Sequence, residues 1–187
     1  MPRDRNGFSD GIEDQDEAYF DSLKGRGPVD RGFDTRLLHE PASILPARKP
    51  VVLGPASSVT DAIRAMKGEH RGVVLVTEDG TPGTPIIGIF SERDVLFRVV
   101  DGGRNPATLA LSEVMTPDPE CLDEEGTIAD TLNQMSVGGF RHVPIVDGKG
   151  RPTFVVSVRD IVQFLVDAFP REILNQSGDR QSQREGG

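Results

Sequence analysis

Residues 140–150 read FRHVPIVDGKG, and a related stretch, RGVVLVTEDG, occupies residues 71–80. Each is a short apolar run that is rich in β-branched side chains and closed by Asp and Gly, a pattern typical of a strand that ends in a turn. Similar segments flank both stretches in the same order, at a spacing of 66 to 70 residues. A period this long predicts two copies of one compact unit rather than a solenoid of short repeats.

Each copy predicts a short β segment, a helix, two strands and a second helix. Ser58 can cap a helix in the first copy, and Thr127 can cap its equivalent in the second. The fold class is therefore α/β (α+β), with two tandem β-α-β-β-α repeats. A unit of about 60 residues buries too little apolar surface to be stable alone. We expect the copies to pack with pseudo-twofold symmetry and to leave matching clefts between them.

The sequence outside the repeats is polar. Residues 1–40 carry 10 Asp or Glu against 6 Lys or Arg, which predicts a disordered acidic arm. Within this arm, residues 17–23 (EAYFDSL) and 34–38 are short stretches that can dock on a partner or on the folded part. The predicted domains are the arm at 1–40, the repeats at 41–105 and 106–170, and a polar C-terminal tail at 171–187.

The composition excludes several classes of protein. The chain has 187 residues, 36% of them hydrophobic, and a net charge of -9, which disfavours nucleic-acid binding because phosphate would be repelled. Its apolar runs are far shorter than the roughly 18 residues of a membrane span, and its first residues contain no apolar signal region. We expect a cytoplasmic protein with no membrane or nucleic-acid partner. One Cys and three scattered His predict no metal site.

The tetrad Ser-x-Arg-Asp occurs twice, as SERD at 91–94 and as SVRD at 157–160, each time after an apolar run. Ser followed three residues later by an acidic residue resembles a capping box, so each tetrad can simply begin a helix. The alternative is a ligand site, because a helix N-terminus presents free N–H groups and a positive dipole to an anion. The occurrence of two tetrads at equivalent places favours the ligand site.

The repeat, the stretch FRHVPIVD at 140–147, the stretch VMTPDP at 114–119 and the two tetrads together resemble the cystathionine beta-synthase (CBS) domain pair, or Bateman module. The resemblance covers about residues 41–170. One departure is that Phe154 stands in the second copy where Gly88 stands in the first. A bulkier side chain there is expected to narrow that cleft.

The resemblance implies that adenosine-containing ligands such as AMP, ADP or ATP bind in clefts between the repeats. Asp94 and Asp160 would accept hydrogen bonds from ribose hydroxyls, and Ser91 and Ser157 would lie beside the phosphates. Basic residues at the start of the central strands would meet phosphate charge: Arg71, Arg141 and His142. Adenine would lie against apolar residues of the preceding β segments: Ile44 and Val51 in one copy, Val114 and Cys121 in the other.

No catalytic motif is visible, since the sequence lacks a G-x-x-x-x-G-K-S/T loop, an H-E-x-x-H pair and a G-x-S-x-G turn. We therefore expect a stand-alone regulatory module and not an enzyme. It would require no cofactor, take an adenine nucleotide as regulatory ligand, form a homodimer and modulate an unidentified protein partner. The alternatives are a ligand-free dimerisation or interaction scaffold, and a sensor of S-adenosylmethionine or NAD.

Overall fold

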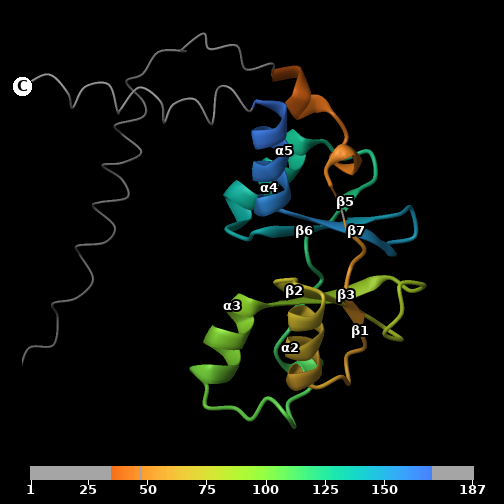
Figure 1. The fold of residues 1–187 in the computed structure, drawn as a ribbon. Coiled ribbons are helices and arrows are strands. Elements are labelled where there is room, and N and C mark those ends of the chain that lie inside the picture. Colours follow the sequence, from red (N-terminus) through yellow and green to blue (C-terminus); the bar gives the residue numbers. More distant parts are fainter. Residues whose placement is uncertain (1–34, 47, 170–187) are drawn as a thin grey trace, which may run out of the picture. The chain divides into compact units, whose positions relative to one another are not determined.

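The structure, a computed structural model, describes residues 35–46 and 48–169 (Figure 1). Its elements follow the predicted order. The first group comprises 3-10 helices η1 (Thr35–His39) and η2 (Ala42–Ile44), β1 (Val52–Leu53), α2 (Val59–Gly68), β2 (Val73–Thr77), β3 (Ile86–Ser91), α3 (Glu92–Asp94) and the π-helix η3 (Val95–Val100). The second comprises the 3-10 helix η4 (Leu111–Glu113), β4 (Thr116–Pro117), β5 (Leu122–Asp123), α4 (Ile128–Gly138), β6 (His142–Val146), β7 (Pro152–Ser157) and α5 (Val158–Ala168).

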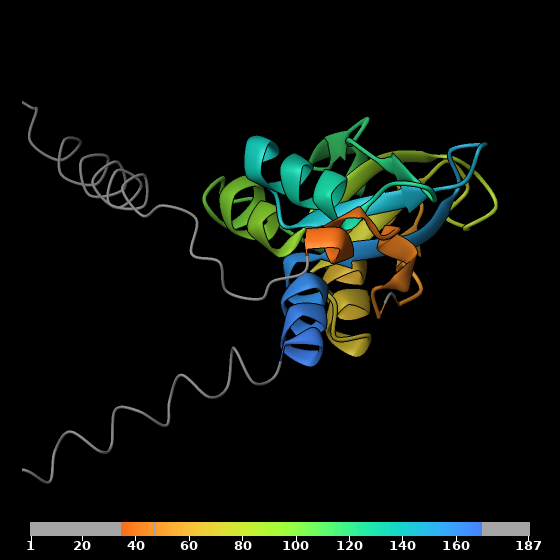
Figure 2. The same cartoon turned by 90° about the horizontal axis from the view of Figure 1, so that it is seen from above.

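The strands form two sheets with equivalent pairing. One sheet has the order β1-β2-β3-β4 and the other β5-β6-β7. In each, a short strand pairs parallel with the central strand, which pairs antiparallel with the next. The sheets lie one above the other with the helices on their outer sides (Figure 1), and the view from above shows that they overlap (Figure 2). The predicted fold of two β-α-β-β-α repeats is confirmed.

The two predicted helix caps are present. The Ser58 hydroxyl accepts from the Asp61 backbone N–H at 3.1 Å at the start of α2, and the Thr127 hydroxyl accepts from the Asp130 N–H at 3.1 Å at the start of α4. In both cases the acidic side chain bonds back to the capping residue, which completes a capping box. Gly139, in the left-handed region with φ 66°, follows the last turn of α4.

Apolar side chains form one core under each sheet and a third layer between the sheets. The third layer contains Val73 and Leu75 from β2 and Val155 from β7. The Ile86 N–H also donates to the Gly150 carbonyl at 3.0 Å, which joins the hairpins of the two repeats. The repeats therefore bury apolar surface against each other, as their small size requires.

The segment that begins each sequence repeat packs on the other repeat. Ala42 and Leu45 are buried in the second core, and Arg48 forms a β-bridge with Val155 of β7. Conversely, Leu111 and Val114 are buried in the first core, and β4 pairs with β3. The predicted boundaries 41–105 and 106–170 thus follow the sequence repeat. In the folded chain, the first segment of each repeat contributes to the core of the other repeat.

Two expectations differ from the structure. The predicted β segments at 44–53 and 114–122 form only short strands of two residues. A 3-10 helix leads into each segment, η2 ending at Ile44 and η4 ending at Glu113, and it packs on the opposite core. The end of the predicted arm is folded, since η1 contacts α4 and its Leu38 packs against the second core. The remaining arm, with residues 17–23, and the tail at 171–187 lie outside the described residues. Among the helices described, none has the length and apolarity that crossing a bilayer requires.

Candidate functional site

Both tetrads lie where a strand passes directly into a helix, and we call these places the first corner (Ser91 and Asp94) and the second corner (Ser157 and Asp160). At each corner the serine backbone N–H donates to Oδ2 of the aspartate at 2.8 Å. The serine hydroxyl donates to the same oxygen, at 2.7 Å in the first corner and 2.6 Å in the second. Each tetrad therefore caps its helix, and capping occupies one carboxylate oxygen only.

The other carboxylate oxygen, Oδ1, distinguishes the two corners. Oδ1 of Asp94 lies 3.2 Å from Nε of Arg98, and the Asp94 side chain is only 14% exposed. For Oδ1 of Asp160, no hydrogen bond or ion pair is found within residues 35–46 and 48–169, although the residue is half-buried rather than enclosed. Within the part of the chain that the structure describes, Oδ1 of Asp160 at the second corner is thus a free hydrogen-bond acceptor, whereas Oδ1 of Asp94 at the first corner is already paired with Arg98.

Arg71 approaches the second corner from the first repeat. Its Nη2 donates to the carbonyl of Lys49 at 3.3 Å. Burial lowers the pKa of Arg71, the charge of Arg48 lowers it further, and the charge of Asp160 acts in the opposite direction. Because the ordinary pKa of arginine is far above neutral, Arg71 remains a cation within electrostatic reach of Asp160. Residues predicted for phosphate and for ribose therefore influence each other electrostatically, although they come from different repeats.

His142 and Glu92 lie together where the two repeats approach each other. Burial lowers the pKa of His142, against the opposing charges of Glu92 and Asp160, so the imidazole is neutral at pH 7. A Cβ on Gly72 would lie 3.3 Å from both Cε1 of His142 and Oε2 of Glu92. Glycine at this position leaves room for the imidazole ring. The predicted Arg141 is exposed instead.

The predicted adenine contacts are distributed differently from expectation. Val114 is buried in the first core, so its side chain faces no cleft, and the carbonyl of Val114 accepts from Arg98. Val51 packs against the same core, whereas Ile44 is 46% exposed on η2. Cys121 is half-buried, its thiol donates to the Pro119 carbonyl, and burial raises the pKa of that thiol. Of these four residues, Ile44 leaves the most side-chain surface open.

The sequence analysis missed two residues that fill the first corner and its surroundings. Arg98 lies four residues after Asp94, a spacing at which helical side chains pair, and this spacing was the available signal.

Met115 covers Gly88 so closely that a Cβ on Gly88 would overlap its sulfur. Phe154, expected to narrow the second cleft, packs against the second core. The glycine at position 88 therefore does not widen the first cleft, because Met115 occupies the space.

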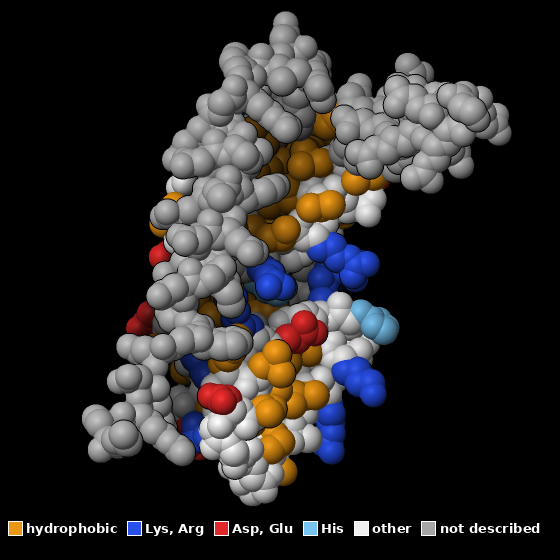
Figure 3. Space-filling model, turned by 90° about the vertical axis from the view of Figure 1, so that its left-hand side faces the viewer, with side chains coloured by type: hydrophobic (Ala, Val, Ile, Leu, Met, Phe, Trp, Pro, Cys, Tyr) orange, Lys and Arg blue, Asp and Glu red, His pale blue; other side chains and the backbone are white. Residues whose placement is uncertain are grey.

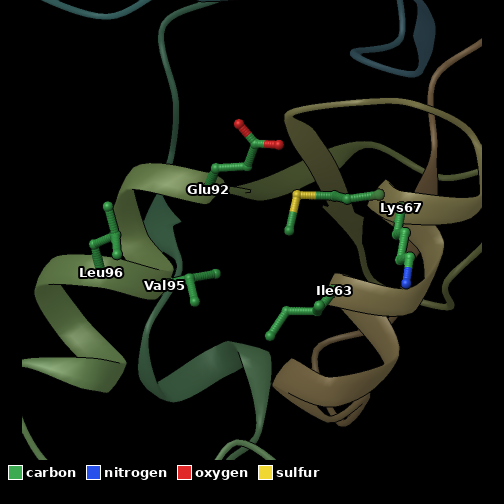
Figure 4. Close-up of a pocket in the computed structure, with 6 residues that line it drawn as sticks. Ile63, Lys67, Glu92, Val95 and Leu96 are labelled. Carbon is green, nitrogen blue, oxygen red and sulfur yellow. The ribbon is translucent and has the colours of Figure 1, made fainter.

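A separate apolar groove of about 440 Å³ lies between α2 and the helical segment formed by α3 and η3. Figure 4 shows Ile63 and Val95 pointing toward each other across it, with Lys67 and Glu92 at its edges. The groove contains no serine or aspartate of either tetrad. Over the described part of the chain, no group of His, Cys, Asp or Glu suited to hold a metal ion is present.

Comparisons with known proteins agree on one family. The CBS domain model matches residues 42–101 and 111–167. The CBS domain-containing protein CBSCBSPB3 of Arabidopsis thaliana is 34% identical over 113 residues, which are 60% of this chain but only 20% of the plant protein. A solved CBS-domain containing protein from Agrobacterium tumefaciens is 29% identical with a TM-score of 0.56, covering 62% of this chain and 84% of that one.

A CBS domain protein from Pyrobaculum aerophilum, solved in complex with AMP, is 22% identical with a TM-score of 0.59. The match covers 65% of this chain and 89% of the other. At that identity the likeness establishes the fold alone.

Proposed function

This chain belongs to the CBS domain family, and from that membership we propose that it is a regulatory, non-catalytic module that binds an adenosine nucleotide at its second corner. The nucleotide, of the AMP, ADP or ATP class, would change the affinity of the module for a partner protein. Binding can do so only if the nucleotide prefers one arrangement of the chain over another.

The observation that carries the proposal is Oδ1 of Asp160, which is unpaired among the described residues and lies within the electrostatic range of Arg71. A carboxylate oxygen is a strong acceptor for ribose hydroxyls, and a guanidinium matches the geometry of phosphate. The same corner begins α5, which has 11 residues, so its N-terminus contributes a positive dipole to the anion. Lys and Arg side chains also gather midway along the face seen in Figure 3, between two groups of hydrophobic side chains.

The AMP complex of the Pyrobaculum protein supports the choice of ligand class, because its fold is the same. That support is limited to the fold, so the ligand is argued from the corner residues of this chain. The competing interpretation is a ligand-free scaffold, in which the tetrads only cap helices. The capping bonds of both corners fit that interpretation equally well.

A thermal-shift screen separates the two interpretations. We expect at least one of AMP, ADP and ATP to raise the melting temperature, because a ligand that binds only the folded chain stabilises it by about 2.7 kcal/mol at 100 times its Kd. S-adenosylmethionine and NAD test the sensor alternative, and ribose 5-phosphate serves as the control without a base. Unchanged melting temperature with every compound would favour the scaffold.

We further propose that two copies of the chain associate through the helical face that carries η3 and α5. Large apolar side chains are exposed at equivalent positions of both repeats: Leu96 (60%) and Val162 (52%), with Phe97 (65%) and Val100 (65%) beside them. Figure 3 shows hydrophobic side chains gathered on the lower part of this face, where α3 and η3 lie. A face repeated by internal symmetry can match a second copy of itself across a twofold axis.

Replacement of Phe97 by aspartate is expected to convert the dimer to monomers, because a charge would have to be buried in an apolar interface. Size-exclusion chromatography with light scattering measures the mass. Ser112→Asp is the matched control. Ser112 is exposed on η4, and aspartate there adds the same negative charge outside the four exposed apolar residues. A wild-type chain that is monomeric, or a Phe97→Asp chain that stays dimeric, would contradict the assignment of this face.

A further inference from the structure

The two corners have the same tetrad sequence but different surroundings, and the difference lies one helical turn later. The residue four positions after the aspartate is Arg98 in the first repeat and Phe164 in the second. Phe164 packs against the second core and has no donor to offer a carboxylate. Arg98, in contrast, turns back onto the first corner.

All three guanidinium nitrogens of Arg98 bond to the protein. Nε pairs with Oδ1 of Asp94 at 3.2 Å, Nη1 donates to the Val114 carbonyl at 2.7 Å, and Nη2 donates to the Thr116 hydroxyl at 3.0 Å. Arg98 therefore ties the Asp94 carboxylate, which is predicted for ribose, to the segment of the second sequence repeat that packs on the first core.

A nucleotide at the first corner would have to displace this bridge. The ribose hydroxyl would have to take Oδ1 of Asp94 from the Arg98 guanidinium, and a neutral hydroxyl cannot replace the positive charge that pairs with the carboxylate. The helical segment after the first corner adds little attraction, because α3 has three residues and continues as a six-residue π-helix. The second corner has neither the bridge nor the interrupted helix.

We propose that Arg98 closes the first corner, so that each chain binds one nucleotide, at the second corner. This inference rests on the proposed function and adds to it the number and location of occupied sites. Arg98 is then a specificity-determining residue: it sets how many of the two equivalent corners can accept ligand. The two repeats thus differ in their capacity to accept ligand because of one side chain outside the tetrad, that of Arg98.

Isothermal titration of the full chain with AMP and with ATP tests the inference through stoichiometry. We expect one nucleotide per chain for the wild type and two per chain for Arg98→Ala. The double variant Arg98→Ala/Asp94→Asn is expected to return to one. Arg104→Ala is the matched control, because Arg104 forms an exposed ion pair with Glu113 at 2.7 Å without contacting the corner, and it should keep one site.

Each outcome distinguishes the inference from the function on which it rests. Two nucleotides per wild-type chain, or a folded Arg98→Ala chain that still binds one, would overturn the closed corner and leave nucleotide binding intact. Absence of binding to every variant would overturn the proposed function itself. If Arg98→Ala does not fold, Arg98→Gln takes its place, since glutamine keeps a donor for the Val114 carbonyl but removes the positive charge that pairs with Asp94. The wild-type stoichiometry tests the closed corner in either case.

Discussion

Replacement of Asp160 by asparagine is expected to weaken adenosine-nucleotide binding roughly 10- to 150-fold, which corresponds to about 1.5–3 kcal/mol for hydrogen bonds to a charged group. Asparagine keeps one oxygen, which can still accept the Ser157 N–H and hydroxyl bonds that cap α5. The second oxygen becomes an NH2 group, which cannot accept a ribose hydroxyl. Isothermal titration with AMP and ATP measures the loss.

The matched control is Asp130→Asn at the start of α4. Asp130 forms the same kind of capping box, accepting from the Thr127 N–H at 3.0 Å and its hydroxyl at 2.6 Å. It lies outside both tetrads, so its replacement should change stability but leave nucleotide affinity unaltered. Equal affinity of the Asp160→Asn chain and the wild type would falsify the second corner as the ribose site.

Replacement of Leu111 by alanine is expected to lower the free energy of unfolding by about 2–5 kcal/mol, the range for a large side chain removed from a packed core. Leu111 is fully buried, and its side chain lies in the first core although the residue belongs to the second sequence repeat. Its backbone N–H also donates to the Ser57 carbonyl at 2.9 Å, which fixes the exchanged segment on the first repeat. Urea denaturation followed by circular dichroism measures the change.

Ser112→Ala provides the comparison, because Ser112 is the next residue and is exposed. It should change stability by no more than about 0.5 kcal/mol, as is usual for surface positions. A loss of less than about 1 kcal/mol for Leu111→Ala would mean that the exchanged segment contributes little to the first core, since burial alone predicts more.

Local features were predictable because they depend on neighbours in the sequence. Ser58 and Thr127 were identified as helix caps from residue type and spacing, and the strands at 73–76 and 143–146 were identified from β-branched runs. The tetrads were located at the ends of strands for the same reason. Their capping bonds span three residues, so no distant contact is needed to form them.

Features that depend on long-range packing were not predictable in the same way. The exchange of segments was missed, because Leu45 and Leu111 are simply apolar in sequence and either core could have buried them. Val114 was expected in a cleft and lies in the first core. Phe154 was expected to narrow the second cleft and packs against the second core, whereas Met115, from the opposite sequence repeat, fills the space over Gly88.

The sequence by itself determined that two β-α-β-β-α units exist, where their helices begin, and that both aspartates stand at strand-to-helix corners. The tertiary structure alone decided that Arg71 lies within electrostatic range of Asp160 and that Arg98 bridges Asp94 to the Val114 carbonyl. The physical reason is one of range. Capping and strand alternation are set by residues a few positions apart, whereas the state of a carboxylate oxygen depends on which distant side chains the folded chain brings within hydrogen-bond distance.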